Sequence, residues 1–130
     1  MSTYTLPAPD APAEDWGRLA VSIPGWRWMP GILNGADGTR YVGNGAFAWE
    51  DPHRHHASGI GPDDWPDPDD PATAGCLLAL LGRCAVYDDG PVWVCEHDRG
   101  RGFGATPGRA CIAVVAALRP WRRSWPGGGA

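Results

Sequence analysis

The longest stretch of the chain without a charged side chain contains its strongest helix signal. An acidic, proline-rich segment at residues 66–70 ends abruptly, and no charged residue then appears until Arg83. Asp70 suits the N-cap, because its carboxylate can accept a hydrogen bond from the first helical turn, and Pro71 suits the first helical position. The pattern predicts a helix from Pro71 to Cys84 or Val86. Because this helix has little polar surface, we expect it to be the central, largely covered element of the core.

Shorter patterns predict the remaining elements. Apolar side chains at helical spacing predict a short helix from Ala13 to Ser22. Thr106 and Pro107 repeat the cap-and-proline start, and they open an apolar helix that ends before Pro120. Alternating or β-rich runs between turn signals predict strands at residues 40–42, 46–49, 91–96 and 102–105. This order predicts an α+β fold, in which a small antiparallel sheet of about four or five strands packs with two main helices and a short N-terminal helix.

Composition narrows the classes of protein that fit this pattern. The 130 residues suffice for a single domain with a real core, with loose tails expected at residues 1–12 and 120–130 and a long loop at residues 50–70. The net charge of −4 argues against a general nucleic-acid binder, and neither a signal peptide nor a membrane-spanning stretch is apparent. The four cysteines form no CxxC pair, and we expect them to be buried and reduced.

Arginine and tryptophan outside the predicted core are candidate binding residues. Arg27 and Trp28 lie between two Pro-Gly pairs, where an indole can stack on a base and a guanidinium can grip a phosphate. Tryptophan and arginine also dominate the energetic centres of protein interfaces. Arg109 follows a predicted helix start, whose free N–H groups favour an anion. The alternatives are core packing for the tryptophans and simple capping at the helix start.

The acidic part of the long loop is a second candidate binding region. Asp63 and Asp64 directly precede Trp65, and further aspartates follow up to residue 70. Such an acidic loop can imitate phosphates and attract a basic partner surface. The alternatives are a site for a hard cation, for which the spacing matches no EF-hand, and a solvated acidic surface.

The only metal-like cluster in the chain lies earlier in the same loop. His53, His55 and His56 follow Glu50 and Asp51, and imidazole with carboxylate suits zinc or another first-row ion. The spacing matches no regular zinc motif, so a solvated polar loop is the alternative. Cys95 and His97, at and just after the end of the strand at 91–96, are too close in sequence for a typical nucleophile and base, which assemble from distant segments. We therefore assign no catalytic residue, no metal and no cofactor.

Two stretches carry a resemblance to known proteins. Residues 24–31 read PGWRWMPG, and residues 67–81 read DPDDPATAGCLLALL. Together they resemble a set of small proteins encoded by bacteriophages and prophages, which also close with an alanine-rich helix like residues 110–118. More distantly, the layout is similar to the phage ABA-sandwich domain, in which a sheet lies between helices. The resemblance implies a phage or prophage origin and a setting in the host cytoplasm, but it implies no activity.

The combined expectation is a non-enzymatic phage accessory protein that binds a host factor and inhibits or sequesters it. A component of an antiviral defence system is the expected target. One alternative is a sponge for a nucleotide signal, with a pocket lined by Arg27, Trp28 and Arg109. Others are a metal-dependent hydrolase or nuclease built on the histidine loop, and a virion or assembly component. The expected partner is a host protein or a nucleotide-type small molecule, without membrane contact, and a homo-oligomer is an open alternative.

Overall fold

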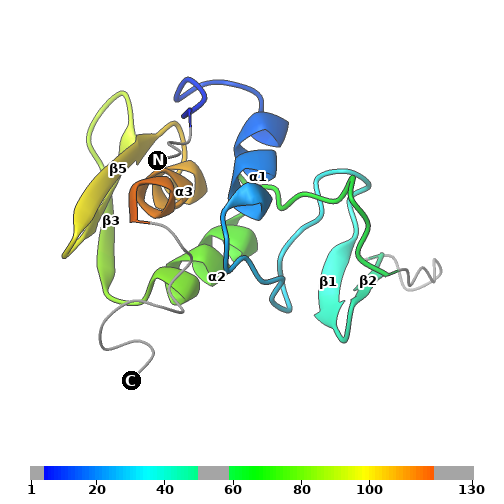
Figure 1. The fold of residues 1–130 in the computed structure, drawn as a ribbon. Coiled ribbons are helices and arrows are strands. Elements are labelled where there is room, and N and C mark those ends of the chain that lie inside the picture. The colour runs from blue at the N-terminus through cyan, green and yellow to red at the C-terminus, as the bar shows by residue number, and fades with distance from the viewer. Residues whose placement is uncertain (1–4, 50–58, 119–130) are drawn as a thin grey trace.

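The fold is α+β, with three helices and two small antiparallel sheets (Figure 1). The computed structural model describes residues 5–49 and 59–118. Strands β1 and β2 form one sheet, and the other has the order β3-β4-β5. The α+β class is confirmed, but the strands divide into two sheets instead of forming the single sheet expected. The elements are α1 (Ala13–Ser22), β1 (Arg40–Gly43), β2 (Ala46–Ala48), α2 (Pro71–Leu81), β3 (Cys84–Asp88), β4 (Trp93–His97), β5 (Gly100–Gly104) and α3 (Pro107–Leu118).

Local signals in the sequence determine most of these boundaries. Helix α1 has the predicted bounds, and α2 and α3 begin at the predicted prolines. The Asp70 carboxylate caps α2 by accepting from the Thr73 N–H at 2.9 Å. Between β1 and β2, Asn44 adopts a positive φ of 56°, which suits a tight hairpin turn. No helix in the described ranges has both the length and the apolar character needed to cross a membrane.

The end of α2 differs from the prediction. The helix stops at Leu81, because Gly82 takes a φ of +82° and its N–H closes the last turn on the Leu78 carbonyl at 3.0 Å. Residues Cys84–Asp88, of which the first three were predicted to extend the helix, form β3 instead. A glycine that readily adopts positive φ therefore separates two elements that read as one apolar run.

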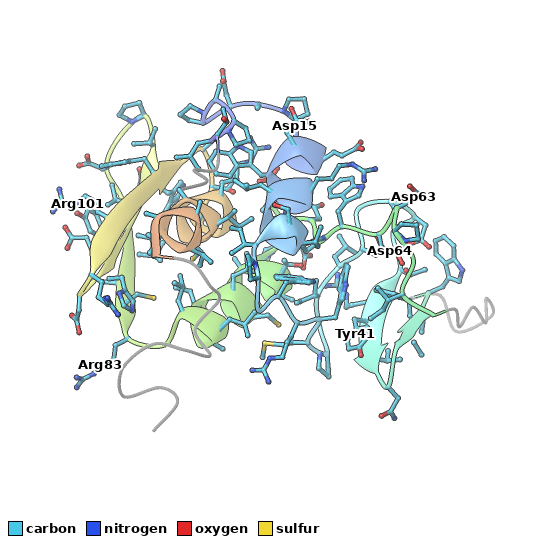
Figure 2. The ribbon with its side chains drawn as sticks, in the orientation of Figure 1. Asp15, Tyr41, Asp63, Asp64, Arg83 and Arg101 are labelled. Atoms are coloured by element: carbon cyan, nitrogen blue, oxygen red, sulfur yellow. The ribbon has the colours of Figure 1, made fainter. Side chains whose placement is uncertain are left out.

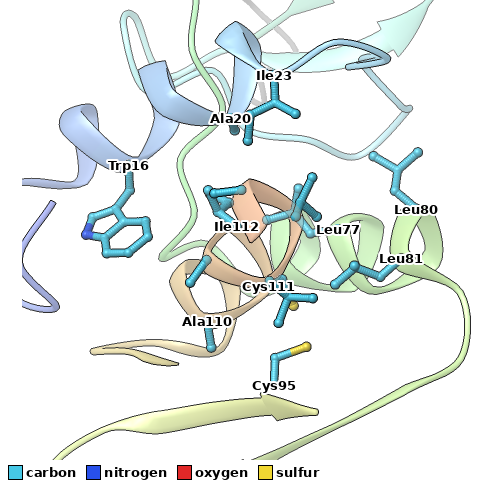
Figure 3. Packing of buried hydrophobic residues seen from close by; sticks show 14 residues of the cluster. Trp16, Ala20, Ile23, Leu77, Leu80, Leu81, Cys95, Ala110, Cys111 and Ile112 are labelled. Carbon is cyan, nitrogen blue, oxygen red and sulfur yellow. The ribbon is translucent and has the colours of Figure 1, made fainter. Parts of the chain in front are cut away.

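Helix α3, and not α2, is the central element of the core. Every residue from Gly108 to Ala116 is buried, and α3 contacts α1, α2 and all three strands of the larger sheet. Figure 3 shows Cys111 and Ile112 surrounded by side chains from α1, α2 and β4. Helix α2 instead exposes one side to solvent at Ala72, Gly75 and Ala79. The expectation of a covered α2 was wrong, because small uncharged residues look like core in sequence but can also lie on the surface.

Glycines let α3 lie directly on β5. A Cβ atom at Gly102 would come within 2.5 Å of the Ala110 carbonyl oxygen, and one at Gly104 within 2.6 Å of the Arg109 Cβ. The Cβ positions that these two glycines leave empty lie on the same face of the strand, which is the face that α3 covers. The spacing of these two glycines therefore sets how closely the central helix approaches the sheet.

Candidate functional site

The start of α3 holds an anion, and that anion belongs to the chain itself. Asp69 accepts hydrogen bonds from Nε and Nη2 of Arg109, each at 2.9 Å, and from Oγ1 of Thr106 at 2.8 Å. Burial raises the pKa of Asp69, but these hydrogen bonds and the guanidinium charge outweigh it and lower the pKa overall. Arg109 Nη1 donates to the carbonyl oxygens of Pro9 and Ala11. Arg109 thus fastens residues 9–11 and the acidic segment to α3.

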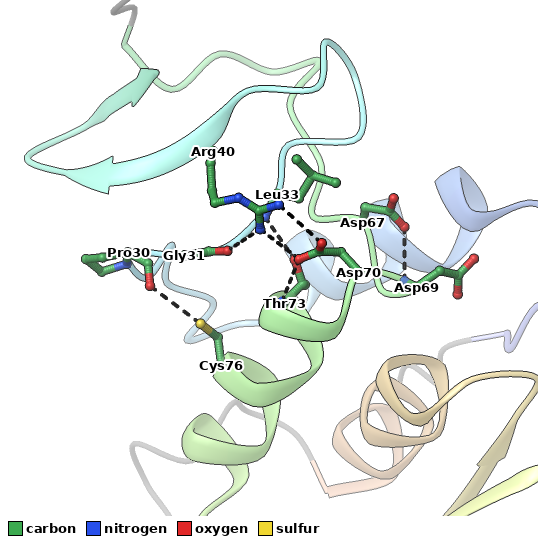
Figure 4. Close-up of polar contacts among 9 residues, drawn as sticks. All are labelled: Pro30, Gly31, Leu33, Arg40, Asp67, Asp69, Asp70, Thr73 and Cys76. Carbon is green, nitrogen blue, oxygen red and sulfur yellow. Dashed lines mark hydrogen bonds and ion pairs between the residues drawn. The ribbon is translucent and has the colours of Figure 1, made fainter. Parts of the chain in front are cut away.

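A second aspartate fastens the β1-β2 hairpin to α2. Asp70 accepts from Nη1 of Arg40 at 2.8 Å, and the same Nη1 donates to the Gly31 carbonyl at 2.9 Å. The Thr73 hydroxyl, which also bonds to Asp70, accepts from the Leu33 N–H at 2.9 Å (Figure 4). Burial raises the pKa of Asp70, but the bonds from Arg40 and Thr73 and the Arg40 charge lower it overall. The acidic motif before α2 therefore has a structural role in this chain.

The predicted acidic site divides into one exposed and two supporting residues. Asp63 is exposed, whereas Asp64 accepts from the Gly61 N–H at 2.7 Å and from Nδ2 of the fully buried Asn34 at 2.8 Å. Figure 2 shows Asp63 and Asp64 on the side of the molecule that carries the hairpin. Trp65 lies across two glycines: a Cβ atom at Gly17 or Gly35 would come within 2.6 Å or less of its ring. Asp64 and Trp65 thus anchor the loop to its neighbours.

Trp28 belongs to an aromatic cluster beneath the hairpin. Its ring centroid lies 5.0 Å from that of Phe47 and 6.0 Å from that of Tyr41, and Tyr41 and Phe47 are both buried. Arg27, the next residue toward the N-terminus, is exposed. The contacts of Trp28 lie at the hairpin, while those of Arg109 lie at the start of α3. The structure does not bring the three residues of the predicted nucleotide pocket together around one cavity.

The structure does not describe the predicted metal cluster, but it places the cysteines. His53, His55, His56, Glu50 and Asp51 lie outside the described residues. Within the described part of the chain, no three side chains of the metal-binding types are arranged to hold an ion. Cys84, Cys95 and Cys111 meet between the sheet and α3. All four cysteines are free as predicted, but only Cys95 and Cys111 are buried, whereas Cys76 and Cys84 are partly exposed.

These three thiols lie in or beside the core, and their environments differ. Cys95 and Cys111 are fully buried, and burial raises the pKa of the half-buried Cys84 to about 12. Hydrogen bonding to Cys95 and burial both raise the pKa of Cys111. Cys95 accepts the hydrogen bonds from Cys111 and Cys84, and these lower its pKa although burial opposes the shift. Cys84 and Cys111 therefore stay protonated and weakly nucleophilic at neutral pH, and the Cys95 thiol is fully enclosed. His97, near Cys95 in sequence, accepts from the Arg99 N–H through Nδ1 at 3.1 Å.

The outer face of the three-stranded sheet is the most site-like surface in the described chain. Figure 1 shows all three helices on one side of this sheet, so its other side is left uncovered by them. The strand register places Tyr87, Val94 and Phe103 in one row across that side. Tyr87 and Phe103 are 40% and 45% exposed, whereas Val94 between them is 1% exposed. Two exposed aromatic side chains therefore lie on either side of a buried valine.

The next row of the same face is charged and internally ordered. Oε1 of Glu96 accepts from the Tyr87 hydroxyl at 2.9 Å and from Arg101 Nη2 at 2.7 Å. The hydrogen bond to Glu96 raises the pKa of Tyr87, so the phenol stays protonated at neutral pH. Because these side chains are well exposed, the ion pair adds little stability and mainly orients the arginine and the phenol. We call Tyr87, Val94, Glu96, Arg101 and Phe103 the outer sheet face.

Two open hollows lie at the end of this face. One, of about 360 Å³, is lined by Arg83, Cys84, Ala85, Glu96, His97 and Asp98. The other, of about 340 Å³, is lined by Glu96, His97, Gly100 and Arg101. Their walls are charged and polar and open to solvent, unlike the enclosed, mostly apolar pockets that bury small ligands. This shape suits the side chains of a protein partner better than a sequestered small molecule.

No prediction from the sequence placed a site on this face. Because residues 84–86 were assigned to a helix, the pairing of Tyr87 with Val94 was not visible. One signal was present. After Gly82, the run alternates between Cys84 and Val86 on one side and Ala85 and Tyr87 on the other, which is typical of a strand. Figure 2 shows Arg83 and Arg101 at the end of the molecule opposite Asp63 and Asp64, so the face is also remote from the predicted acidic site.

Comparisons with known proteins add no relative. Neither the protein-family models, nor the curated proteins, nor the solved structures contain a match to this chain.

Proposed function

We propose that this chain acts by binding a protein partner through the outer sheet face. The observation that carries the proposal is the row of Tyr87, Val94 and Phe103, in which two exposed aromatic rings flank a buried valine. Tyrosine and arginine are enriched at the energetic centres of protein interfaces. Here Glu96 holds both Tyr87 and Arg101 by hydrogen bonds before any partner arrives. Less side-chain entropy is then lost on binding.

The finer proposal concerns the partner and its setting. The resemblance of residues 24–31 and 67–81 to phage and prophage proteins supports a host protein as the partner, bound in the host cytoplasm. Inhibition or sequestration of that protein, without catalysis, is the proposed outcome, and a defence component is the proposed target. The open, polar hollows beside the face favour a protein over a nucleotide. Cys95 and Cys111 are fully buried, so neither thiol is accessible to a substrate in the folded chain.

A pair of matched variants tests which surface binds. Arg101→Ala with Phe103→Ala removes one exposed arginine and one exposed apolar side chain from β5. Arg27→Ala with Val42→Ala removes the same two kinds of side chain from the hairpin side of the molecule, where Val42 is 57% exposed. Tagged wild type and both variants are incubated with host extract, and captured proteins are quantified by mass spectrometry.

We expect the sheet-face variant to capture at least about tenfold less of the partner than the wild type, as is typical when an interface hot spot is truncated. The hairpin variant should retain it. Loss with the hairpin variant alone would overturn the choice of surface. A stoichiometric nucleotide released from the purified protein on denaturation would overturn the protein partner in favour of a nucleotide sponge. A stoichiometric metal with hydrolytic activity lost in His55→Ala would favour an enzyme instead.

A further inference from the structure

Among the described residues, strand β3 has an open hydrogen-bonding edge. In the sheet order β3-β4-β5, β3 pairs with β4 on one side, and within the described chain no strand lies on its other side. The opposite edge of the sheet is partly closed, because the Ala105 N–H, just after β5, donates to the Pro9 carbonyl at 3.2 Å. An open edge presents a row of N–H and C=O groups that can pair with a strand from another chain.

The β3 edge lacks the features that usually prevent such pairing. Its five residues, Cys84–Asp88, pair with β4 in an unbroken register without a bulge. The strand contains no proline and no lysine, and its only charged residue is Asp88 at the end. Bulges, prolines and charges in the middle of the strand are the common protections of edge strands. The charges here lie instead at or beyond the two ends, where Arg83 precedes the strand and Asp89 follows it.

We propose that β3 pairs antiparallel with β3 of a second copy of this chain, about a two-fold axis at Val86. The outer sheet faces of two copies related in this way lie on the same side, so outward residues must oppose outward residues. Among the registers that satisfy this condition, only the one centred on Val86 pairs all five residues of the strand. Two three-stranded sheets then become one sheet of six strands.

Charge and size both favour this register. Arg83 opposes Asp89 of the partner subunit, and the two-fold axis repeats the pair. Both side chains are exposed, and neither has an ion-pair partner among the described residues. On the outer face the small side chain of Ala85 opposes Tyr87 of the partner subunit, which leaves room for the phenol ring. Exposed ion pairs contribute modestly to affinity, but they discriminate strongly between registers.

The pairing would double the outer sheet face without covering it. Hydrogen bonds between the strands lie in the plane of the sheet, so the row of Tyr87, Val94 and Phe103 stays open in both copies. The dimer does not depend on the proposed binding function, because it uses the backbone edge of β3 and the charges at its ends. Its test therefore contains no partner protein.

A charge exchange tests both the dimer and its register. The wild type should sediment at equilibrium as a dimer, with twice the chain mass of 13.9 kDa, at protein concentrations in the range of tens of micromolar. Arg83→Asp places aspartate against Asp89 of the partner subunit twice, and we expect the dimer dissociation constant to rise about tenfold or more. Arg83→Asp combined with Asp89→Arg should restore it to within about threefold of the wild type.

A control variant and the fold are checked in parallel. Arg99→Asp makes the same change of charge in the exposed turn between β4 and β5, and it should leave the dissociation constant unchanged. Far-ultraviolet circular dichroism confirms that each variant folds. A monomeric wild type at about 100 μM, or a dimer insensitive to Arg83→Asp, would overturn the proposal. Failure of the double variant to restore dimerisation would overturn the register centred on Val86.

Discussion

Each of the three described helices contains one glycine, and the structure predicts opposite effects of replacing these glycines with alanine. Gly17 lies in α1, Gly75 in α2 and Gly108 in α3. Intrinsic helix propensity alone predicts that alanine stabilises a helix interior by about 1 kcal/mol relative to glycine. The surroundings differ, because a Cβ atom at Gly75 would meet nothing within 4 Å. A Cβ atom at Gly108 would lie 2.0 Å from the Pro68 carbonyl oxygen.

The magnitudes follow from these distances. Gly75→Ala should raise the free energy of unfolding by about 0.5–1 kcal/mol, and the melting temperature by about 4 °C. Gly108→Ala forces the start of α3 away from a backbone oxygen that cannot rotate aside, next to the pair of Asp69 and Arg109. We expect a loss of about 3 kcal/mol. Gly17→Ala should lie nearer to Gly108→Ala, since its Cβ would approach the Pro66 oxygen to 2.4 Å.

Urea unfolding followed by tryptophan fluorescence measures all three variants, because the chain contains eight tryptophans. Gly75→Ala is the matched control, since it makes the same chemical change on a helix surface. Equal stability of Gly75→Ala and Gly108→Ala would refute the close approach of Pro68 to α3. A destabilised Gly75→Ala would show that the exposed side of α2 is covered.

Three further outcomes are expected. Asp69→Asn leaves the buried Arg109 guanidinium without a carboxylate and should cost about 2 kcal/mol at pH 7 in urea unfolding. Because the folded pKa of Asp69 is lowered, its stabilising contribution is present above the ordinary carboxyl pKa near 4 and is lost as the pH falls through the folded value. The stability difference from the wild type should therefore narrow below about pH 4, and a gap constant from pH 7 to pH 2.5 would contradict the ion pair. Asn34→Ala removes a fully buried amide that bonds to Asp64 and should cost about 2 kcal/mol in the same assay, whereas an unchanged midpoint would refute that network. At pH 8 a thiol reagent should modify Cys95 and Cys111 only after urea is added, because both are fully buried, and modification of the folded protein would contradict the packing around them.

Local patterns in the sequence predicted the helix starts well and the tertiary pairing poorly. The N-cap at Asp70 depends on residues within one helical turn, so the sequence alone identifies it. The ion pair of Asp69 and Arg109 spans 40 residues, and nothing local indicates it. The pattern at Thr106 to Arg109 does predict an anion site, and the structure supplies the anion from another loop of the same chain. A local motif can thus identify the chemistry of a site without identifying its ligand.

The exposed outer sheet face was not predicted, for a related physical reason. Trp28 and Trp65 were predicted to bind because indole rings stack on bases and are frequent in interface hot spots, and both pack against neighbouring elements instead. Tyr87 and Phe103 have no local signal that distinguishes them from core aromatic residues. Only the pairing of β3, β4 and β5 shows which side of the sheet α3 covers. Exposure is therefore a property of the assembled sheet and not of any one segment.

The central position of α3 has a consequence for synthesis of the chain. The helix on which α1, α2 and the larger sheet all pack is the last of the described elements to leave the ribosome. Until residues 107–118 emerge, the apolar faces of the earlier elements have no helix to pack against. In the nascent chain these faces therefore stay exposed to chaperones and proteases. A premature stop codon anywhere upstream of Pro107 would remove the core of the whole domain, so that even late truncations should be degraded and not merely impaired.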